Sequence, residues 1–401
     1  MGQRMKLSEN HRIDLPASGM KSHYSRFLAT APERLHFAAH SHHPWPDVTR
    51  EAQLEAWDDA ARLADLKWDR VFGDVVTEAQ GHIASVLDLP APAQIAFAPN
   101  THEFLVRLLS CFPPGRKLKV VTTDAEFLSF SRQMTRLEEE ALVDVTRVPA
   151  EPFSSFSARF IESARSPGND LIFLSQVFFN SGFVVQDLEA IVEAAAPRAM
   201  VVIDGYHGFF AIPTSLRRVA DRAFFLAGGY KYAQSGEGVC FLSVPRGFEG
   251  RPLNTGWFAG FGSLESGDFQ RVPFSRDGFR LMGATFDPVG LYRFNAVARL
   301  FKSNGLTIAA VDAHVKSLQR LFLKGLGGRE GASPSPSDLI APLDGISGLG
   351  HFLTFRRADA ASIADRLAAR RVIVDHRGDR LRFGFGMYHD AADVETLLTR
   401  L

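Results

Sequence analysis

Cysteine is almost absent from this sequence, with Cys111 and Cys240 as the only two in 401 residues. Two cysteines cannot build a disulfide framework or a cysteine-based metal site. Charge of one sign is also missing, because 45 basic residues balance 45 acidic ones. A formal net charge of zero argues against nucleic acid or an anionic membrane surface as a partner. We therefore expect a chain kept in a reducing environment.

Long apolar runs are missing as well. No stretch reaches the roughly 18 apolar residues of a membrane-spanning helix. The first residues, Met-Gly-Gln-Arg-Met-Lys, contain no apolar core of a secretory signal, and Gly2 lacks the downstream Ser or Thr of a myristoylation site. Together these absences predict a cytoplasmic protein without a membrane partner.

Two short apolar runs, Met200–Ile203 and Ala223–Ala227, carry the clearest strand signal. Asp204 directly follows the first run, and Lys231 lies shortly after the second. Ligands of open α/β sheets bind beyond the carboxyl ends of the strands. We therefore expect the acid and the lysine to face one ligand.

An aspartate and a lysine in this arrangement suit pyridoxal 5'-phosphate (PLP). The lysine amine can form a Schiff base with the aldehyde, and the carboxylate can keep the pyridine nitrogen protonated so that the ring accepts electrons. Either residue alone also fits a surface lysine or a loop-capping aspartate. The neighbouring His207, Tyr230 and Tyr232 favour the PLP interpretation.

This stretch resembles the fold-type I, class V PLP-dependent enzymes, and among them most closely the kynureninases. That family carries an Asp-x-x-His at one strand end and a Tyr-Lys-Tyr at the next. Here the two motifs read Asp204-Gly-Tyr-His207 and Tyr230-Lys231-Tyr232. The resemblance runs from about residue 35 to the end of the sequence.

The resemblance implies an α/β fold with a mainly parallel seven-stranded sheet, helices on both of its faces and a small C-terminal α/β domain. We expect an N-terminal segment that joins the small domain over residues 1–45, the PLP-binding domain over 46–288 and the small domain over 289–401. It also implies a homodimer, because the family builds its site at a subunit boundary.

Two predictions about the fold come from the residues themselves. Only about a dozen residues separate Val239–Val244 from the preceding strand, which is too short for a helical crossover, so this strand should run antiparallel to its neighbour. Residues 47–88 show helical spacing of Trp57, Leu63, Leu66 and Trp68, which predicts packing rather than function.

The resemblance assigns several positions to the cofactor phosphate. Asn100 and Thr101 stand between a short strand and a helical pattern, and the amide groups of a helix N-terminus suit an anion. An ordinary helix cap is the alternative. Thr285, in a segment that resembles the family's Phe-Arg-x-x-Gly region, is the candidate for a phosphate contact that the family often makes across the dimer. Trp257, in a Gly-Trp-Phe match, is expected near the cofactor.

The pyridine ring is expected to contact residues further along the sheet edge. Phe127 matches the aromatic residue that stacks on the ring, although it shares only the Phe and Ser of the family's Phe-Pro-Ser/Thr-Asp pattern. A core phenylalanine is the alternative. Ser175 matches a cofactor-contacting serine. The predicted cofactor-binding set is Asn100, Thr101, Phe127, Ser175, Asp204, His207, Tyr230, Lys231, Trp257 and Thr285.

Ser41 and Arg382 are the predicted substrate contacts. Ser41 lies in His40-Ser41-His42-His43, where the family has Asn-Ser-Leu-Gly. A metal site is the other interpretation of these histidines, but their spacing fits no helix face and no acid or cysteine is close in sequence; we predict no metal. Arg382 matches the arginine that binds the substrate carboxylate, for which its planar fork is suited. Arg377 competes for this role, and a solvated arginine is the alternative for both.

The resemblance implies hydrolytic Cβ–Cγ cleavage of an amino acid, with release of alanine and an aromatic acid, as in tryptophan catabolism. Lys231 would bind PLP and deprotonate Cα, Asp204 would hold the pyridinium, and Tyr230 would assist with the phosphate and with proton transfer. One departure concerns the substrate, because the segment 62–68 lacks the family's substrate-contacting histidine.

Other functions remain open. A class V aminotransferase or a related lyase acting on a different amino acid would use the same cofactor residues. Cysteine desulfurase chemistry is disfavoured, because it needs a mobile reactive cysteine well after the lysine, and Cys240 falls in a predicted buried strand. A catalytically silent PLP-fold protein would not need both Asp204 and Lys231.

Overall fold

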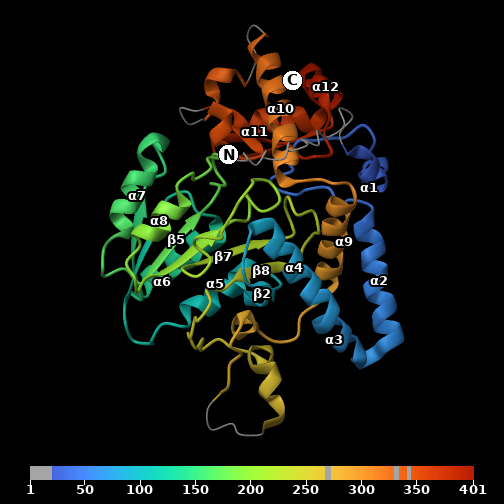
Figure 1. The fold of residues 1–401 in the computed structure, drawn as a ribbon. Helices are drawn as coiled ribbons and strands as arrows, with labels where there is room; N and C mark the ends of the chain where they lie inside the picture. The colour runs from blue at the N-terminus through green and yellow to red at the C-terminus, as the bar shows by residue number, and fades with distance from the viewer. Residues whose placement is uncertain (1–19, 267–271, 329–333, 341–344) are drawn as a thin grey trace, which may run out of the picture.

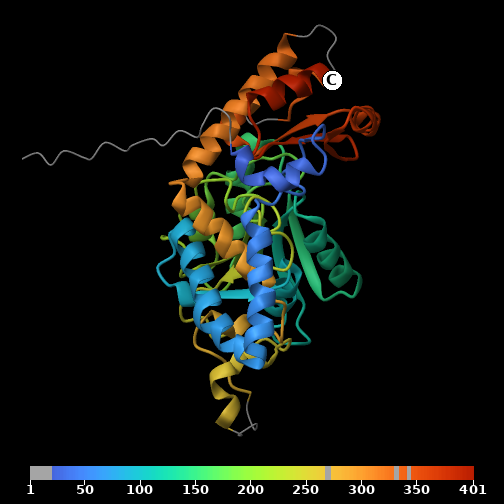
Figure 2. The same cartoon turned by 90° about the vertical axis from the view of Figure 1, so that its right-hand side faces the viewer.

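The computed structural model describes residues 20–266, 272–328, 334–340 and 345–401. Most of the predicted N-terminal segment, residues 1–19, lies outside them. A body built on a large sheet carries the C-terminal helices and a small sheet at one end, seen at the top of both views (Figures 1 and 2). The described helices do not include one that combines the length and apolar character needed to cross a membrane.

The large sheet has seven strands in the order β2-β8-β7-β6-β5-β3-β4. Every adjacent pair is parallel except the two pairs that involve β8, which is antiparallel to both β2 and β7. This confirms the predicted seven-stranded, mainly parallel sheet and the predicted antiparallel strand. The strands are β2 Ile95–Ala98, β3 Leu118–Thr123, β4 Val143–Val148, β5 Leu171–Ser175, β6 Met200–Asp204, β7 Ala223–Gly228 and β8 Cys240–Ser243.

Helices cover both faces of this sheet, which explains why its central strands are continuous apolar runs rather than alternating ones. All residues of β2, β5, β7 and β8 are buried. The helices of the body are α2 Val48–Leu63, α3 Lys67–Arg70, α4 Val76–Leu87, α5 Thr101–Leu109, α6 Leu128–Glu139, α7 Phe156–Ala164, α8 Leu188–Ala194 and α9 Val289–Ser303.

The smaller end is built from a three-stranded antiparallel sheet, order β11-β12-β9, and a two-stranded parallel sheet that pairs β1 with β10. The β1–β10 pair ties the N-terminal segment to the C-terminal part of the chain. The elements are α1 Ser25–Ala29, β1 Leu35–His36, α10 Ile308–Gly327, β9 Phe352–Arg356, α11 Ala360–Ala369, β10 Val372–Ile373, β11 Asp375–Arg377, β12 Arg380–Gly384 and α12 Ala391–Arg400.

The long helices α9 and α10 belong to different surroundings. α9 packs on α2 and α4 beside the large sheet, whereas α10 packs on α12 (Figure 1). The domain boundaries at residues 45 and 288 stay predictions.

The predicted packing role of the α2 region is wrong for two of its large side chains. Trp57 is 69% exposed and Leu66 is 67% exposed. The buried face of α2 is formed by smaller residues, among them Ala52 and Ala56. Trp68 does pack, with its ring centroid 5.8 Å from that of Phe72.

Candidate active site

A cavity of about 240 Å³ lies at the carboxyl ends of β5 and β6, beside the first turn of α5, and is bordered by β11 and β12. Nine residues of the predicted site line it: Ser41, Thr101, Phe127, Ser175, Asp204, His207, Tyr230, Lys231 and Arg382. Phe127, Ser175, Asp204 and Lys231 meet here because the parallel strands β3, β5, β6 and β7 all end at this edge. Ser41 and Arg382 reach the cavity from the smaller end of the molecule.

Asp204 and Lys231 share this cavity as predicted. Asp204 is the last residue of β6 and accepts a hydrogen bond from the Tyr206 amide at 2.9 Å. The partly buried Lys231 amine lies 2.6 Å from His207 Nε2, 5.4 Å from the centre of the Phe127 ring and 5.3 Å from that of Tyr206. The lysine is therefore held between an acid, an imidazole and two aromatic rings.

Burial shifts the pKa values of the three ionisable groups Lys231, Asp204 and His207. It lowers the pKa of the Lys231 amine to about 7, a shift that the Asp204 carboxylate opposes and Arg382 reinforces. It raises the pKa of Asp204 to about 6 and lowers the pKa of His207 well below its ordinary value. A neutral lysine amine is accordingly accessible near neutral pH, and a neutral His207 can accept a hydrogen bond from it.

This shift predicts how fast the cofactor-free protein takes up an aldehyde such as PLP. The rate should rise about tenfold per pH unit up to pH 7 and level off above it, because only the neutral amine attacks. Stopped-flow absorbance at a series of pH values measures this rate. A rate that still climbs tenfold between about pH 8 and 9, as for an ordinary lysine of pKa about 10.4, would contradict the prediction.

Asn100 and Thr101 lie at the N-terminus of α5, and only Thr101 lines the cavity. The Asn100 side chain accepts from the Glu103 amide at 3.0 Å and does not line the cavity, so it acts as the helix cap. Thr101 does line the cavity. A helix N-terminus that opens into the cavity suits a phosphate group, and a cofactor contact from Asn100 stays a prediction.

The substrate end of the cavity contains Ser41 and both candidate arginines. Arg382 is only 4% exposed, and its guanidinium donates to the Phe179 carbonyl and forms an ion pair with Asp375 on the adjacent strand. Arg377 lies 3.3 Å from the same carboxylate. Although burial opposes the shift, the His40 ring and these arginines hold the pKa of Asp375 well below its usual range.

Trp257 and Thr285 lie outside the cavity lining. Trp257 is 42% exposed, and its indole nitrogen donates to the Thr285 hydroxyl at 3.3 Å. Within one chain they bind each other rather than the candidate site, and their cofactor roles stay predictions.

Three cavity residues were not singled out from the sequence: His40, Phe179 and Tyr206. Tyr206 lies inside the Asp-x-x-His motif, and Phe179 lies in the turn after β5, so position alone could have identified both. The His40 ring stacks on Phe352 with the centroids 4.7 Å apart, a contact with the small sheet that no local pattern reveals. Among the described residues, no group of three or more metal-ligating side chains is suited to a metal ion.

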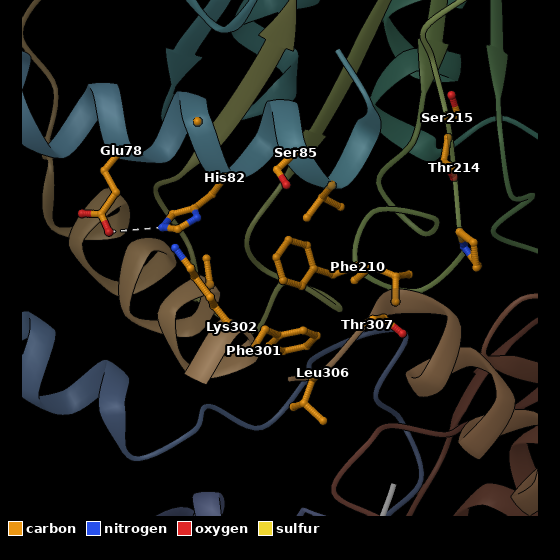
Figure 3. Close-up of a pocket in the computed structure, with 15 residues that line it drawn as sticks. Glu78, His82, Ser85, Phe210, Thr214, Ser215, Phe301, Lys302, Leu306 and Thr307 are labelled. Carbon is orange, nitrogen blue, oxygen red and sulfur yellow. Dashed lines mark hydrogen bonds and ion pairs between the residues drawn. The ribbon is translucent and has the colours of Figure 1, made fainter. Parts of the chain in front are cut away.

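A larger cavity, of about 1040 Å³, lies between α4, α9 and the start of α10 (Figure 3). Phe210 and Phe301 line it together with Glu78 and His82, whose side chains are 3.1 Å apart. Lys302 reaches it from α9 but is exposed. Perturbed, buried ionisable groups mark functional sites more specifically than cavity size does, so the smaller cavity is the candidate active site.

The residues of the smaller cavity fit PLP. Lys231 offers an amine for the aldehyde, and Asp204 offers a carboxylate for the ring nitrogen. Phe127 presents an aromatic ring to the same space, and Thr101 presents a hydroxyl at a helix N-terminus for the phosphate. When bound, the cofactor supplies an electron sink for a carbanion at the substrate Cα.

Comparison with known proteins gives one consistent family. The family model described as aminotransferase class-V matches residues 66–397. A protein of Vibrio cholerae serotype O1 named "Probable cysteine desulfurase" is 25% identical over 345 residues, which cover 80% of this chain and 81% of that protein.

Solved structures share the fold at low sequence identity. The complex of the cystine C-S lyase C-DES with its product cysteine persulfide matches with a TM-score of 0.77 and 16% identity, covering 94% of this chain and 98% of that one. The apo structure of the cysteine desulfurase from Thermococcus onnurineus NA1 matches with a TM-score of 0.76 and 17% identity. That match covers 99% of this chain and 97% of the other. At these identities the likeness shows the fold alone.

The predicted kynureninase-type hydrolysis is wrong. The curated relative is named as a cysteine desulfurase, and the solved structures named above are a carbon–sulfur lyase and a cysteine desulfurase. The predictions that the protein is a hydrolase and acts in tryptophan catabolism depended on that reaction and are not supported either. The error has a physical source: Asp204, His207 and Lys231 were matched to cofactor-binding positions, and residues at such positions do not determine which bond of the substrate breaks.

The family match spans most of the chain, and the seven-stranded sheet is mainly parallel with one antiparallel strand, as expected. A partly buried lysine and an aspartate line the cavity at the edge of this sheet. The chain belongs to the aminotransferase class V family of PLP-dependent enzymes.

Proposed function

We propose that this enzyme is a carbon–sulfur lyase for a small cysteine-derived amino acid, and that it releases the sulfur on the leaving group instead of passing it to a protein cysteine. The observation that supports this proposal most is the location of the two cysteines, neither of which lines the cavity.

Neither thiol is suited to accept sulfur. Cys240 is buried in β8 with its Sγ 3.5 Å from the Tyr206 hydroxyl, and burial raises its pKa to about 12. Cys111 follows α5, donates to the Arg107 carbonyl at 3.4 Å, and burial raises its pKa to about 12 as well. The thiolate is the nucleophilic form of cysteine. Since the sequence has no third cysteine, we infer that the sulfur leaves without an acceptor thiol from these residues.

An amino-acid disulfide such as cystine satisfies this requirement. Lys231 would take the Cα proton, the Cβ–S bond would break, and the electron pair would leave with a persulfide. Addition of one water then gives pyruvate and ammonia, so that cystine and water yield cysteine persulfide, pyruvate and ammonia. Arg382 would hold the substrate carboxylate, and the low pKa of a persulfide lets it leave readily. The solved structure of C-DES is named for this kind of cleavage.

The test is turnover of the PLP-loaded protein with L-cystine, L-cysteine and L-alanine in separate reactions. We expect pyruvate and a cyanide-reactive persulfide in equal amounts from cystine. Amino-group transfer from alanine to a keto acid, with no sulfur product from cystine, would replace the lyase by the aminotransferase alternative.

We also propose a homodimer in which Trp257 and Thr285 reach the cofactor site of the second copy. Both residues are exposed and neither lines the cavity of its own chain, which supports this arrangement. Light scattering should give twice the chain mass of 44.2 kDa. Thr285→Ala should weaken PLP binding several-fold without changing the fold, and a monomer that binds PLP as tightly as the wild type would contradict the arrangement.

A further inference from the structure

Glu126 is a buried carboxylate that none of the roles above uses. It lies between β3 and α6 and is 2% exposed. Its two oxygens accept three hydrogen bonds, from the Thr123 hydroxyl at 2.7 Å, the Ser175 amide at 3.1 Å and the Ser175 hydroxyl at 2.6 Å. The carboxylate therefore joins the end of β3 to the end of β5 at the edge of the sheet that carries the cavity.

The hydrogen bonds to Glu126 come from neutral donors. Within the described ranges, no lysine, arginine or histidine nitrogen lies within the 4.0 Å of an ion pair with it. Burying a carboxylate without a cation costs free energy, and a neutral side chain of the same length could bridge the two strands. A role in the site explains why an acid stands here.

Two neighbours of Glu126 face the cavity. Ser175 lines it and is the register partner of Asp204 across β5 and β6. Phe127, the next residue in the chain, lines it with an exposed ring. The carboxylate thus lies directly behind both the serine and the aromatic ring predicted to contact the cofactor.

A serine hydroxyl has one proton to donate and two lone pairs to accept with. While that proton is donated to Glu126, Ser175 can offer only a lone pair to a molecule in the cavity. We propose that Glu126 is a positioning residue of the cofactor site, which orients the Ser175 hydroxyl as an acceptor toward the cavity and anchors the segment that carries Phe127.

Electrostatics agree with this geometry. Burial raises the pKa of Glu126 to about 7, with a further contribution from the negative charge of Asp204, while the hydrogen bonds from Ser175 and Thr123 oppose the shift. Asp204 on β6 is the charged group that acts on it, and Thr123 and Ser175 on β3 and β5 are neutral. The orientation of the Ser175 hydroxyl should therefore be best defined above neutral pH, where the carboxylate is ionised.

The inference concerns cofactor binding and does not depend on which amino acid the enzyme cleaves. Its test is a double-mutant cycle on PLP affinity, with Glu126→Gln, Ser175→Ala and the double variant. We expect Glu126→Gln to weaken PLP binding about 3- to 10-fold, the range of one lost hydrogen bond, and to shift the pH midpoint of the visible band of the bound cofactor. In the Ser175→Ala background the same change should cost at most about twofold, because coupled residues are not additive.

Two further variants serve as a second test and as a control. Glu126→Asp keeps the charge but shortens the side chain, so it should weaken PLP binding like the glutamine variant; affinity equal to the wild type would overturn the positioning role. Glu78→Gln removes a carboxylate from α4, outside this cavity, and should leave the affinity unchanged. Independent, multiplying effects of Glu126→Gln and Ser175→Ala would also overturn the proposal.

Discussion

Lys231→Ala is expected to lower lyase turnover by about 10³-fold or more, the upper range for loss of a catalytic proton-transfer group. Among the residues that the structure describes, it is the one lysine in the lining of the cavity. Its removal would take away both the amine that would join the cofactor and the base that would deprotonate Cα. Pyruvate formation from cystine measures the loss.

The matched control for this change is Lys302→Ala, which removes an exposed lysine from the larger cavity between α4 and α9. Turnover of that variant should equal that of the wild type. If Lys231→Ala kept more than a tenth of the wild-type rate, another residue would have to be the base.

Asp204→Asn is expected to lower turnover about 10²- to 10³-fold, as for the loss of one preorganised electrostatic contact in a buried site. The amide keeps the shape and the acceptor for the Tyr206 amide, but it cannot hold a positive charge on the ring nitrogen. The absorbance spectrum should still show bound PLP, so the loss falls on the chemical step rather than on binding.

Asp88→Asn serves as its control, because Asp88 is paired with Arg217 at the surface and has no contact with the cavity. An Asp204→Asn variant with wild-type turnover would show that the carboxylate does not act on the cofactor.

The features best predicted from the sequence depend on the length of the connection between two strands and on the residues at which strands end. The short connection before Val239–Val244 was enough to predict the antiparallel β8, because no helix fits in it. The strand ends at Asp204 and Ser175 predicted which edge of the sheet carries the candidate site, since parallel strands end on the same side.

Contacts between distant segments could not be predicted in this way. His40 reaches the cavity because it stacks on Phe352 of the small sheet, and the Arg382 guanidinium donates to the carbonyl of Phe179, far away in the sequence. Trp57 has helical spacing with other apolar residues but is exposed, because the spacing identifies a helix face without saying which partner covers it.

The choice of reaction was the weakest part of the sequence argument. Residues that hold the cofactor are compatible with several reactions, whereas the residues at the substrate end, such as Ser41 and its histidine neighbours, depart from the kynureninase pattern. The location of Cys111 and Cys240 discriminates better, because it limits where sulfur can go.

The most direct test of this account is the activity of the cysteine-free variant Cys111→Ser/Cys240→Ala, loaded with PLP and supplied with L-cystine. We predict persulfide and pyruvate at a rate within about twofold of the wild type, because neither thiol reaches the cavity or is ionised. Loss of persulfide release in the folded variant, restored when one cysteine is returned, would contradict the account.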